Sequence, residues 1–109
     1  MLTKIKKQFY EYAISELEVI NDGLSKTNIK PREECEIVEK VFSVSHQLCG
    51  TGPMLGFDSS SQMCKKLEKI FYDIKRGQRE ITPQVLLQTK RIIESLIQTI
   101  HKEANPKPS

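Results

Sequence analysis

Apolar residues recur at intervals of three and four along most of the chain, which is the pattern of amphipathic helices, and no segment alternates convincingly as a strand does. The pattern divides into four stretches, at about residues 3–24, 31–52, 58–76 and 83–100. Their apolar stripes consist of Ile5, Phe9, Ala13, Leu17, Ile20 and Leu24; Ile37, Val41, Val44 and Leu48; Met63, Leu67, Ile70, Phe71 and Ile74; and Val85, Leu86, Thr89, Ile92, Ile93, Leu96, Ile97 and Ile100. Four amphipathic helices with short loops predict an all-α fold, an antiparallel (up-down) four-helix bundle.

Prolines, glycines and capping side chains predict where these helices begin and end. Pro31 suits the first turn of the second helix, and Pro53 prevents that helix from continuing beyond residue 52. The Asp-Ser-Ser-Ser run at 58–61 supplies candidate N-caps for the third helix, and Gly77 is its natural terminator. Thr82, followed by a proline, is the cap-plus-first-turn signature of the fourth helix.

A length of 109 residues indicates one domain with a single modest core. We expect the bundle to cover residues 1–104, and the proline-broken segment 105–109 to be a disordered tail or linker. Apolar residues make up 38% of the chain and charged residues 28%, as in globular proteins. No apolar run approaches the roughly 20 residues of a membrane span, and the basic N-terminus lacks the apolar core of a signal peptide.

The charged residues and the cysteines narrow the class of partner and the compartment. The net charge of +3 is mild and its lysines are scattered among acids, so we expect no nucleic-acid binding and a mildly positive face suited to an acidic protein. Three widely spaced cysteines, Cys35, Cys49 and Cys64, indicate reduced thiols that fill semi-buried positions. We therefore expect a cytoplasmic, monomeric protein without membrane insertion.

The candidate chemistry lies near the end of the second predicted helix. His46 is followed one turn later by Gly50, so the two residues share one helical face. Glycine inside a helix costs about 1 kcal/mol relative to alanine, which a helix that only packs has no reason to accept. The glycine therefore suggests that a partner must reach the imidazole of His46.

Residues 46–57 resemble the signature of histidine-containing phosphotransfer (HPt) domains. The family pattern His-x-Leu-Lys-Gly corresponds here to His46-Gln47-Leu48-Cys49-Gly50, and its Leu-Gly-Phe to Leu55-Gly56-Phe57. The resemblance covers most of the chain, from about Phe9 to Ile100. It implies that His46 accepts a phosphoryl group from a receiver aspartate and passes it on in a two-component phosphorelay, and that Gly50 lets the receiver come close. Gln47 and Cys49, between them, would lie on the same docking surface.

The chain is more closely similar to the amino-terminal phosphotransfer domain of chemotaxis histidine kinases. That subgroup has a glutamate on the third helix that accepts the other N–H of the imidazole, and Glu68 occupies the corresponding place. Such an acceptor fixes the tautomer and leaves the distal nitrogen nucleophilic. From the sequence alone, Glu68 is equally compatible with a solvated carboxylate that pairs with Lys65 or Lys69.

Cys49 departs from the family pattern, which usually has a lysine three residues after the histidine. That lysine would place a positive charge beside the phosphohistidine, and cysteine cannot. Lys65 and Lys66 on the third helix are the candidates to supply the charge, and Lys65, three residues before Glu68, is the better placed. The departure bears on rate and partner choice more than on the basic chemistry.

The sequence carries no P-loop, no glycine-rich nucleotide loop and no acidic cluster for Mg²⁺. We therefore expect a phosphoryl carrier without independent catalytic machinery and without a cofactor of its own. By resemblance, its partners are a receiver (response-regulator) domain, which would bring Mg²⁺ and the aspartyl phosphate, and/or a histidine kinase, of which the chain could be a domain.

Other interpretations stay open at this point. An HPt-like bundle that carries no phosphate could bind a receiver or histidine kinase as an adaptor or inhibitor, and a purely structural helical domain is a third possibility. His46 and Cys49 at i, i+3 suggest a metal site, but zinc normally needs four ligands, and neither the other cysteines nor His101 have ligand spacing. We expect no metal, and expect His101 to be a favourable charge near the end of the last helix. Met54, Leu55 and Phe57 could form docking surface, although we favour core anchors for the last two.

Overall fold

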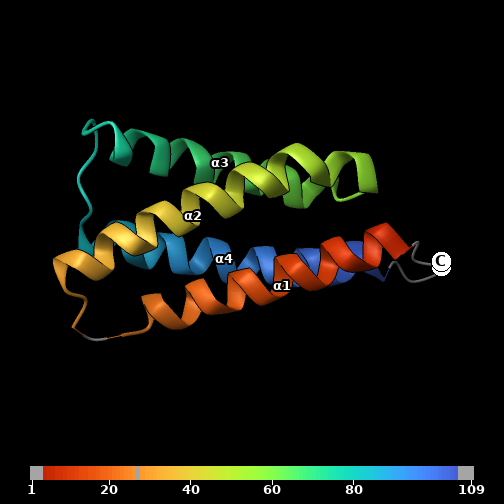
Figure 1. The fold of residues 1–109 in the computed structure, drawn as a ribbon, viewed down its shortest axis with the longest axis horizontal. Coiled ribbons are helices and arrows are strands. Elements are labelled where there is room, and N and C mark those ends of the chain that lie inside the picture. Colours follow the sequence, from red (N-terminus) through yellow and green to blue (C-terminus); the bar gives the residue numbers. More distant parts are fainter. Residues whose placement is uncertain (1–3, 27, 106–109) are drawn as a thin grey trace.

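The computed structural model describes residues 4–26 and 28–105, and its described residues contain four α-helices and no strand. The helices are α1 (Lys4–Leu24), α2 (Pro31–Thr51), α3 (Asp58–Lys75) and α4 (Pro83–Ala104), with a short 3₁₀ helix, η1 (Gly52–Leu55), after α2. Successive helices run in opposite directions (Figure 1). The predicted all-α, antiparallel four-helix bundle is confirmed.

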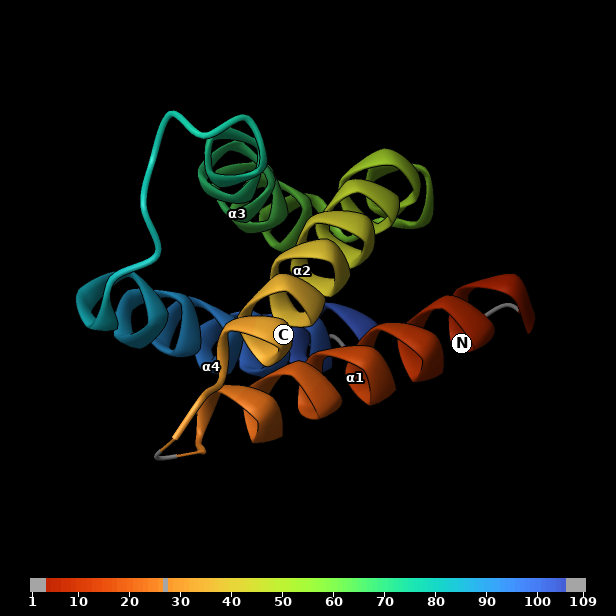
Figure 2. The ribbon, with the colours of Figure 1, turned by 60° about the vertical axis from the view of Figure 1, so that its left-hand side comes forward.

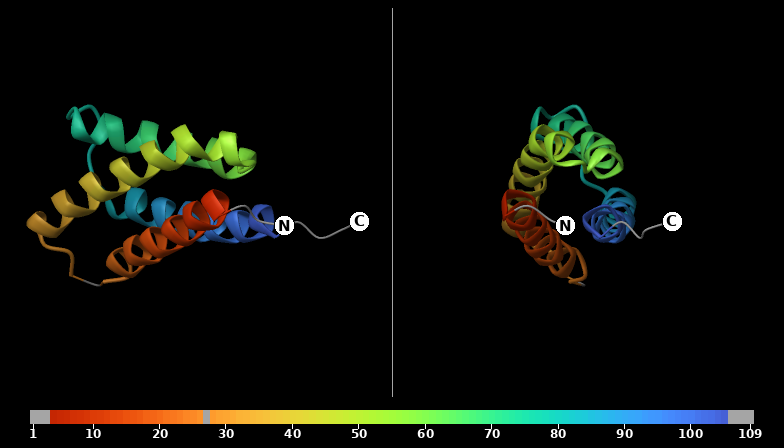
Figure 3. Two further views of the ribbon diagram at one scale, coloured as in Figure 1. Left: turned by 45° about the vertical axis from the view of Figure 1, so that its right-hand side comes forward. Right: turned by 90° about the vertical axis from the view of Figure 1, so that its right-hand side faces the viewer.

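Each helix packs against the helix that precedes it and the helix that follows it in the chain. The first and last helices, α1 and α4, also pack against each other. The four helices therefore surround one core, as the end-on view in Figure 3 shows. Figure 2 shows that α2 crosses α1 and α4 at a clear angle while staying beside α3. The pair α2–α3, joined by η1, is the scaffold that carries His46.

Both predicted ends of α2, the predicted start of α4 and the predicted stop of α3 are confirmed, whereas α4 continues past the predicted residue 100 to Ala104. Pro31 occupies the first turn of α2, and Oγ1 of Thr82 accepts the backbone N–H of Val85 at 3.1 Å as the N-cap of α4. Gly77 follows α3 with φ +75°, and the N–H of the next residue, Gln78, donates to the carbonyl of Asp73 at 2.9 Å. This is the Schellman termination, which favours glycine because of its positive φ.

The predicted N-caps of α3 are wrong. The N-cap is Phe57, whose side chain makes no capping hydrogen bond, and residues 58–61 already lie inside the helix. The carboxylate of Glu103 on α4 binds the first turn instead, accepting the backbone N–H of Ser59 at 3.1 Å and of Ser60 at 2.9 Å. A side chain 43 residues away thus satisfies the free amides, which local pattern reasoning does not foresee.

The core agrees with most of the predicted stripes, but it also contains Val38, which they missed, and it differs at the start of α1. Ile5 is 67% exposed, so its assignment to the stripe is wrong: it lies in the first turn of α1, beyond the buried part of the bundle. Phe57 is fully buried and its ring packs 5.1 Å from that of Phe9, which confirms it as a core anchor. Leu55 packs against the core from a partly buried position, whereas Met54 is 83% exposed.

One smaller expectation, about Cys35, also differs from the structure, and the prediction for the C-terminal tail is not tested by it. Cys35 is exposed, so it is not the semi-buried filler expected; Cys49 is half-buried and Cys64 buried. Of the segment 105–109, only Asn105, the C-cap of α4, belongs to the described residues, so the predicted tail lies outside them. None of the helices described is long and apolar enough to cross a membrane.

Candidate functional site

His46 projects from the last third of α2 with its side chain 71% exposed. Its Nδ1 atom contacts Oε2 of Glu68 on α3, a carboxylate that is itself only 25% exposed. A carboxylate oxygen accepts hydrogen bonds, so Nδ1 of the imidazole carries the proton and donates it. The other ring nitrogen, Nε2, is then the one that can act as a nucleophile.

Glu68 meets His46 because α2 and α3 pair in a constant antiparallel register. Two further contacts follow the same register: Nζ of Lys75 lies 3.2 Å from Oε2 of Glu39, and the rings of Phe42 and Tyr72 lie 6.2 Å apart. Each step of three or four residues along α2 is matched by an equal step back along α3. The pairing of the two helices therefore sets the geometry of the site.

The alternative view of Glu68, a solvated carboxylate paired with a neighbouring lysine, is wrong. Its partner is His46, and Lys69 pairs with Asp73 at 3.2 Å instead. No ion pair of Lys65 is found in the part of the chain that the structure describes. The contact between Glu68 and His46, which the sequence left open, is thus present.

Phe42, one turn before His46, is a site residue that sequence reasoning missed. The two rings lie within 14° of parallel, with centroids 6.1 Å apart. Nζ of Lys75 lies 4.5 Å from the centroid of the Phe42 ring. Phe42 therefore supports the imidazole from one side, and its position four residues before the histidine was the signal that could have identified it.

Gly50, one turn after His46, leaves the other side open. A Cβ atom built at Gly50 would meet no atom within 4 Å, so nothing inside the bundle requires glycine there. Gly52, two residues on, is the opposite case, because a Cβ there would collide with Oγ of Ser61. The first glycine leaves space open outside the molecule, and the second permits close packing of η1 against α3.

Gln47 faces α1 and forms a hydrogen bond with the hydroxyl of Tyr12. The hydroxyl donates to Oε1 of Gln47, which ties α1 to the residue directly after His46. Partial burial is the main cause that raises the pKa of Tyr12, so its hydroxyl stays protonated and keeps donating at neutral pH. No sequence signal pointed to Tyr12.

The remaining predicted site residues lie around the α2–α3 seam. Cys49 is half-buried, and Lys65 and Lys66 are exposed. Residues three apart on a helix share a face and residues two apart do not, so Lys65 lies on the Glu68 side of α3 and Lys66 on the other side. The structure thus separates the two lysines that the sequence treated as alternatives.

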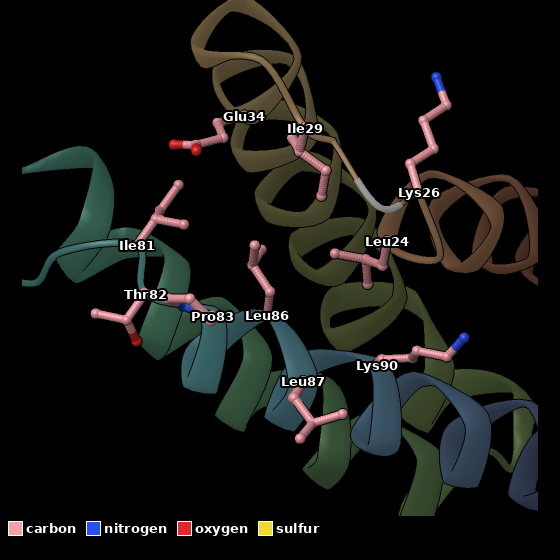
Figure 4. A pocket seen from close by; sticks show the side chains of 10 residues that line it. All are labelled: Leu24, Lys26, Ile29, Glu34, Ile81, Thr82, Pro83, Leu86, Leu87 and Lys90. Atoms are coloured by element: carbon pink, nitrogen blue, oxygen red, sulfur yellow. The ribbon is translucent and has the colours of Figure 1, made fainter.

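A pocket of about 370 Å³ lies at the opposite end of the bundle from His46, between the end of α1 and the starts of α2 and α4. Figure 4 shows Leu24, Ile29 and Leu86 turned toward a common space. Of the two lysines at its rim, Lys26 pairs with Glu33 at 3.1 Å and Lys90 binds Oγ of Ser25 at 2.6 Å. This pocket is lined by both apolar and polar side chains, its two lysines already have partners, and it shares no residue with the His46 site.

His101, the other histidine, has a different environment. Its Nδ1 atom lies 2.6 Å from the hydroxyl of Tyr10, and the two rings meet edge to face. It is thus held by a phenol rather than by a carboxylate. Among residues 4–26 and 28–105, no group of three or more histidine, cysteine, aspartate or glutamate residues could hold a metal ion.

Comparison with known proteins gives one match. The family model of the Hpt domain matches residues 4–100, nearly the whole described chain. No curated protein and no solved structure matches the chain.

Proposed function

Because the chain belongs to the Hpt domain family, which performs histidine phosphotransfer in two-component phosphorelays, we propose that His46 is the residue that carries the phosphoryl group. The observation that carries this proposal is the contact between Nδ1 of His46 and the carboxylate of Glu68, on an imidazole whose side chain is 71% exposed. Because Nδ1 is bound to Glu68 and the ring is accessible, Nε2 can react with a phosphoryl group. His101, bound to a phenol, lacks the carboxylate.

The proposed reaction is a reversible displacement at phosphorus. The lone pair of Nε2 of His46 attacks the phosphorus of an aspartyl phosphate on a receiver domain, the bond to the aspartate oxygen breaks, and the aspartate leaves as a carboxylate. The imidazole gains positive charge in this step, and the carboxylate of Glu68 beside Nδ1–H offsets it. Positioning and charge neutralisation are the main tasks of a protein in phosphoryl transfer, and we expect Mg²⁺ to be held by the receiver.

Lys65 is the cation that we propose for the phosphoryl group. The register of α2 and α3 that pairs His46 with Glu68 places Lys65 across the seam from Cys49, where the family pattern usually has lysine. Its side chain is exposed, so the ammonium can turn toward a phosphoryl group on Nε2. The positive charge would thus come from α3 instead of α2.

Hpt domains interact with receiver domains and histidine kinases, and we propose a receiver as the direct partner at the α2–α3 surface. Gly50 supports this assignment, because its missing side chain leaves open space one turn from His46. The contact between His46 and Glu68 also supports the closer likeness to the phosphotransfer domains of chemotaxis kinases.

The test is to incubate the protein with receivers charged by acetyl phosphate and to assay for acid-labile, alkali-stable phosphate on the bundle. We expect transfer to the unaltered protein and to His101→Gln, and none to His46→Gln, with equal helicity of all three by circular dichroism. Transfer to His46→Gln would overturn the assignment. Tight binding of receivers without any transfer to the unaltered protein would instead support a non-phosphorylated adaptor.

A further inference from the structure

Cys49 on α2 and Cys64 on α3 lie at the same level of the bundle. On one side of this level, His46 on α2 contacts Glu68 on α3. On the other side, a Cβ at Gly52, the residue directly after α2, would collide with Ser61, so the end of α2 and the start of α3 approach closely there too. Counting three residues back from Gly52 and three residues on from Ser61 brings Cys49 opposite Cys64. The register of His46 with Glu68 brings Cys49 opposite Lys65, the residue next to Cys64.

The surroundings of the two thiols differ. Cys64 is fully buried in the core, and Cys49 packs against that core from a half-buried position. Burial is the largest cause that raises the pKa of Cys64 to about 12, and the neighbouring Cys49 and Glu68 raise it further. That electrostatic influence is short in range, which agrees with the register in making the two thiols neighbours.

We propose that Cys49 and Cys64 form an oxidisable dithiol that a peroxide closes into a disulfide between α2 and α3. The half-buried thiol of Cys49 reacts first: its sulfur attacks one peroxide oxygen, the O–O bond breaks, and hydrogen peroxide yields Cys49 sulfenic acid and one water. The thiol of Cys64 then attacks the sulfur of Cys49, and the displaced hydroxide takes the Cys64 proton to leave as a second water. Two thiols are oxidised and one peroxide is reduced.

The buried position of Cys64 slows this second step without preventing it. A thiol with a pKa of about 12 is ionised in only about one molecule in 10⁵ at pH 7. Well-oriented groups within one molecule react at effective concentrations of about 10⁵ M or more, which offsets that small fraction. The sulfenic acid of Cys49 therefore reacts with Cys64 of the same molecule and needs no external thiol.

The third cysteine provides a matched control. Cys35 lies fourteen residues before Cys49 on the same helix, about 21 Å away along its axis, and it is exposed. It is too far to pair with either thiol in the same molecule. The inference uses only the packing of α2 against α3, so it holds whether or not His46 carries phosphate.

The test treats the reduced protein with hydrogen peroxide, then alkylates the remaining thiols in denaturant and measures intact and peptide masses. We expect the unaltered protein and Cys35→Ser to lose two hydrogens and to yield a peptide in which Cys49 is linked to Cys64. Cys49→Ser and Cys64→Ala should form no intramolecular link, and dithiothreitol should restore both thiols of the unaltered protein.

Three results would each overturn the proposal. They are full alkylation of all three cysteines after peroxide, links that involve Cys35, and Cys49 sulfinic acid formed while Cys64 stays alkylatable. Cys49 is half-buried whereas Cys64 is buried, so Cys49→Ser gives the negative control even if Cys64→Ala folds poorly. Phosphotransfer by the reduced protein is measured separately and decides only the role of His46.

Discussion

The carboxylate of Glu103, in the last turn of α4, binds Ser60 in the first turn of α3. Its Oε1 atom accepts the backbone N–H of Ser60 at 2.9 Å and the hydroxyl of the same residue at 2.5 Å, while Oε2 accepts the N–H of Ser59 at 3.1 Å. The negative charge also lies at the positive end of the α3 dipole. Glu103 therefore holds α4 to the start of the helix that carries Glu68.

Removing this carboxylate should destabilise the bundle. We expect Glu103→Ala to lower the free energy of unfolding by about 1–2 kcal/mol, because N-cap groups and hydrogen bonds to charged groups contribute that much. Urea denaturation measures the change. Glu94→Ala, an exposed carboxylate on the same helix, is the control and should stay within about 0.5 kcal/mol of the unaltered protein. Equal losses in the two variants would contradict the capping role.

Gly52 should tolerate no side chain while Ser61 is present. In Gly52→Ala the new methyl group collides with Oγ of Ser61, a hydroxyl that is already bound to the carbonyl of Phe57 at 2.6 Å, so we expect a loss of about 1–3 kcal/mol in unfolding free energy. Adding Ser61→Ala removes the colliding atom and should recover part of that loss. Denaturant unfolding of the two single variants and the double variant tests this coupling, and simple additivity would argue against the collision.

Gly50 should behave in the opposite way. A methyl group there meets nothing inside the bundle, so we expect Gly50→Ala to leave the unfolding free energy unchanged or to raise it by up to about 1 kcal/mol. The same methyl stands one turn from His46 on the docking side, so phosphotransfer from a receiver should slow. Parallel unfolding and transfer assays separate the two effects. A variant that is both less stable and slower would show that Gly50 serves the fold.

The sequence was sufficient to predict the fold because the helices depend on local pattern. Periodicity marked the four helices, and Gly77 and Thr82 marked ends that the structure confirms. Contacts between helices were harder to predict from the sequence. Glu68 was proposed only by resemblance, since its meeting with His46 depends on the register of α2 and α3, which no local pattern encodes.

The error at the start of α3 arose because a distant residue supplies a contact that is usually local. Residues 58–61 have the composition of N-caps, yet Glu103 supplies the acceptor from α4, so the helix begins with these residues inside it. Tyr12 was missed for the same reason, because it reaches Gln47 across the α1–α2 interface. Only the packing of the helices determines which side chains form hydrogen bonds with each other or with backbone groups of another helix.

Lys65 and Lys66 form a matched pair for testing the proposed phosphate contact. Lys65 lies on the Glu68 side of α3 and Lys66 on the other side, and both are exposed. We expect Lys65→Ala to slow phosphotransfer about 10-fold, as expected when a charge worth roughly 1.4 kcal/mol to the transition state is lost, and Lys66→Ala to leave it unchanged. Rapid-quench transfer assays at low ionic strength measure both rates. Equal rates for the two variants would leave no specific role for Lys65.

Glu68 should orient His46 without being needed for folding. Its carboxylate holds the proton on Nδ1, so Glu68→Ala should let the neutral ring adopt the other tautomer, and transfer should fall about 10–100-fold, the usual effect of losing an orienting partner. Nitrogen-15 NMR of the imidazole reports the tautomer directly, and rapid-quench assays report the rate. Asp73→Ala, which breaks the pair with Lys69 on the same helix, is the control and should change neither. An unaltered tautomer together with an unaltered rate in Glu68→Ala would show that the contact plays no part in the reaction.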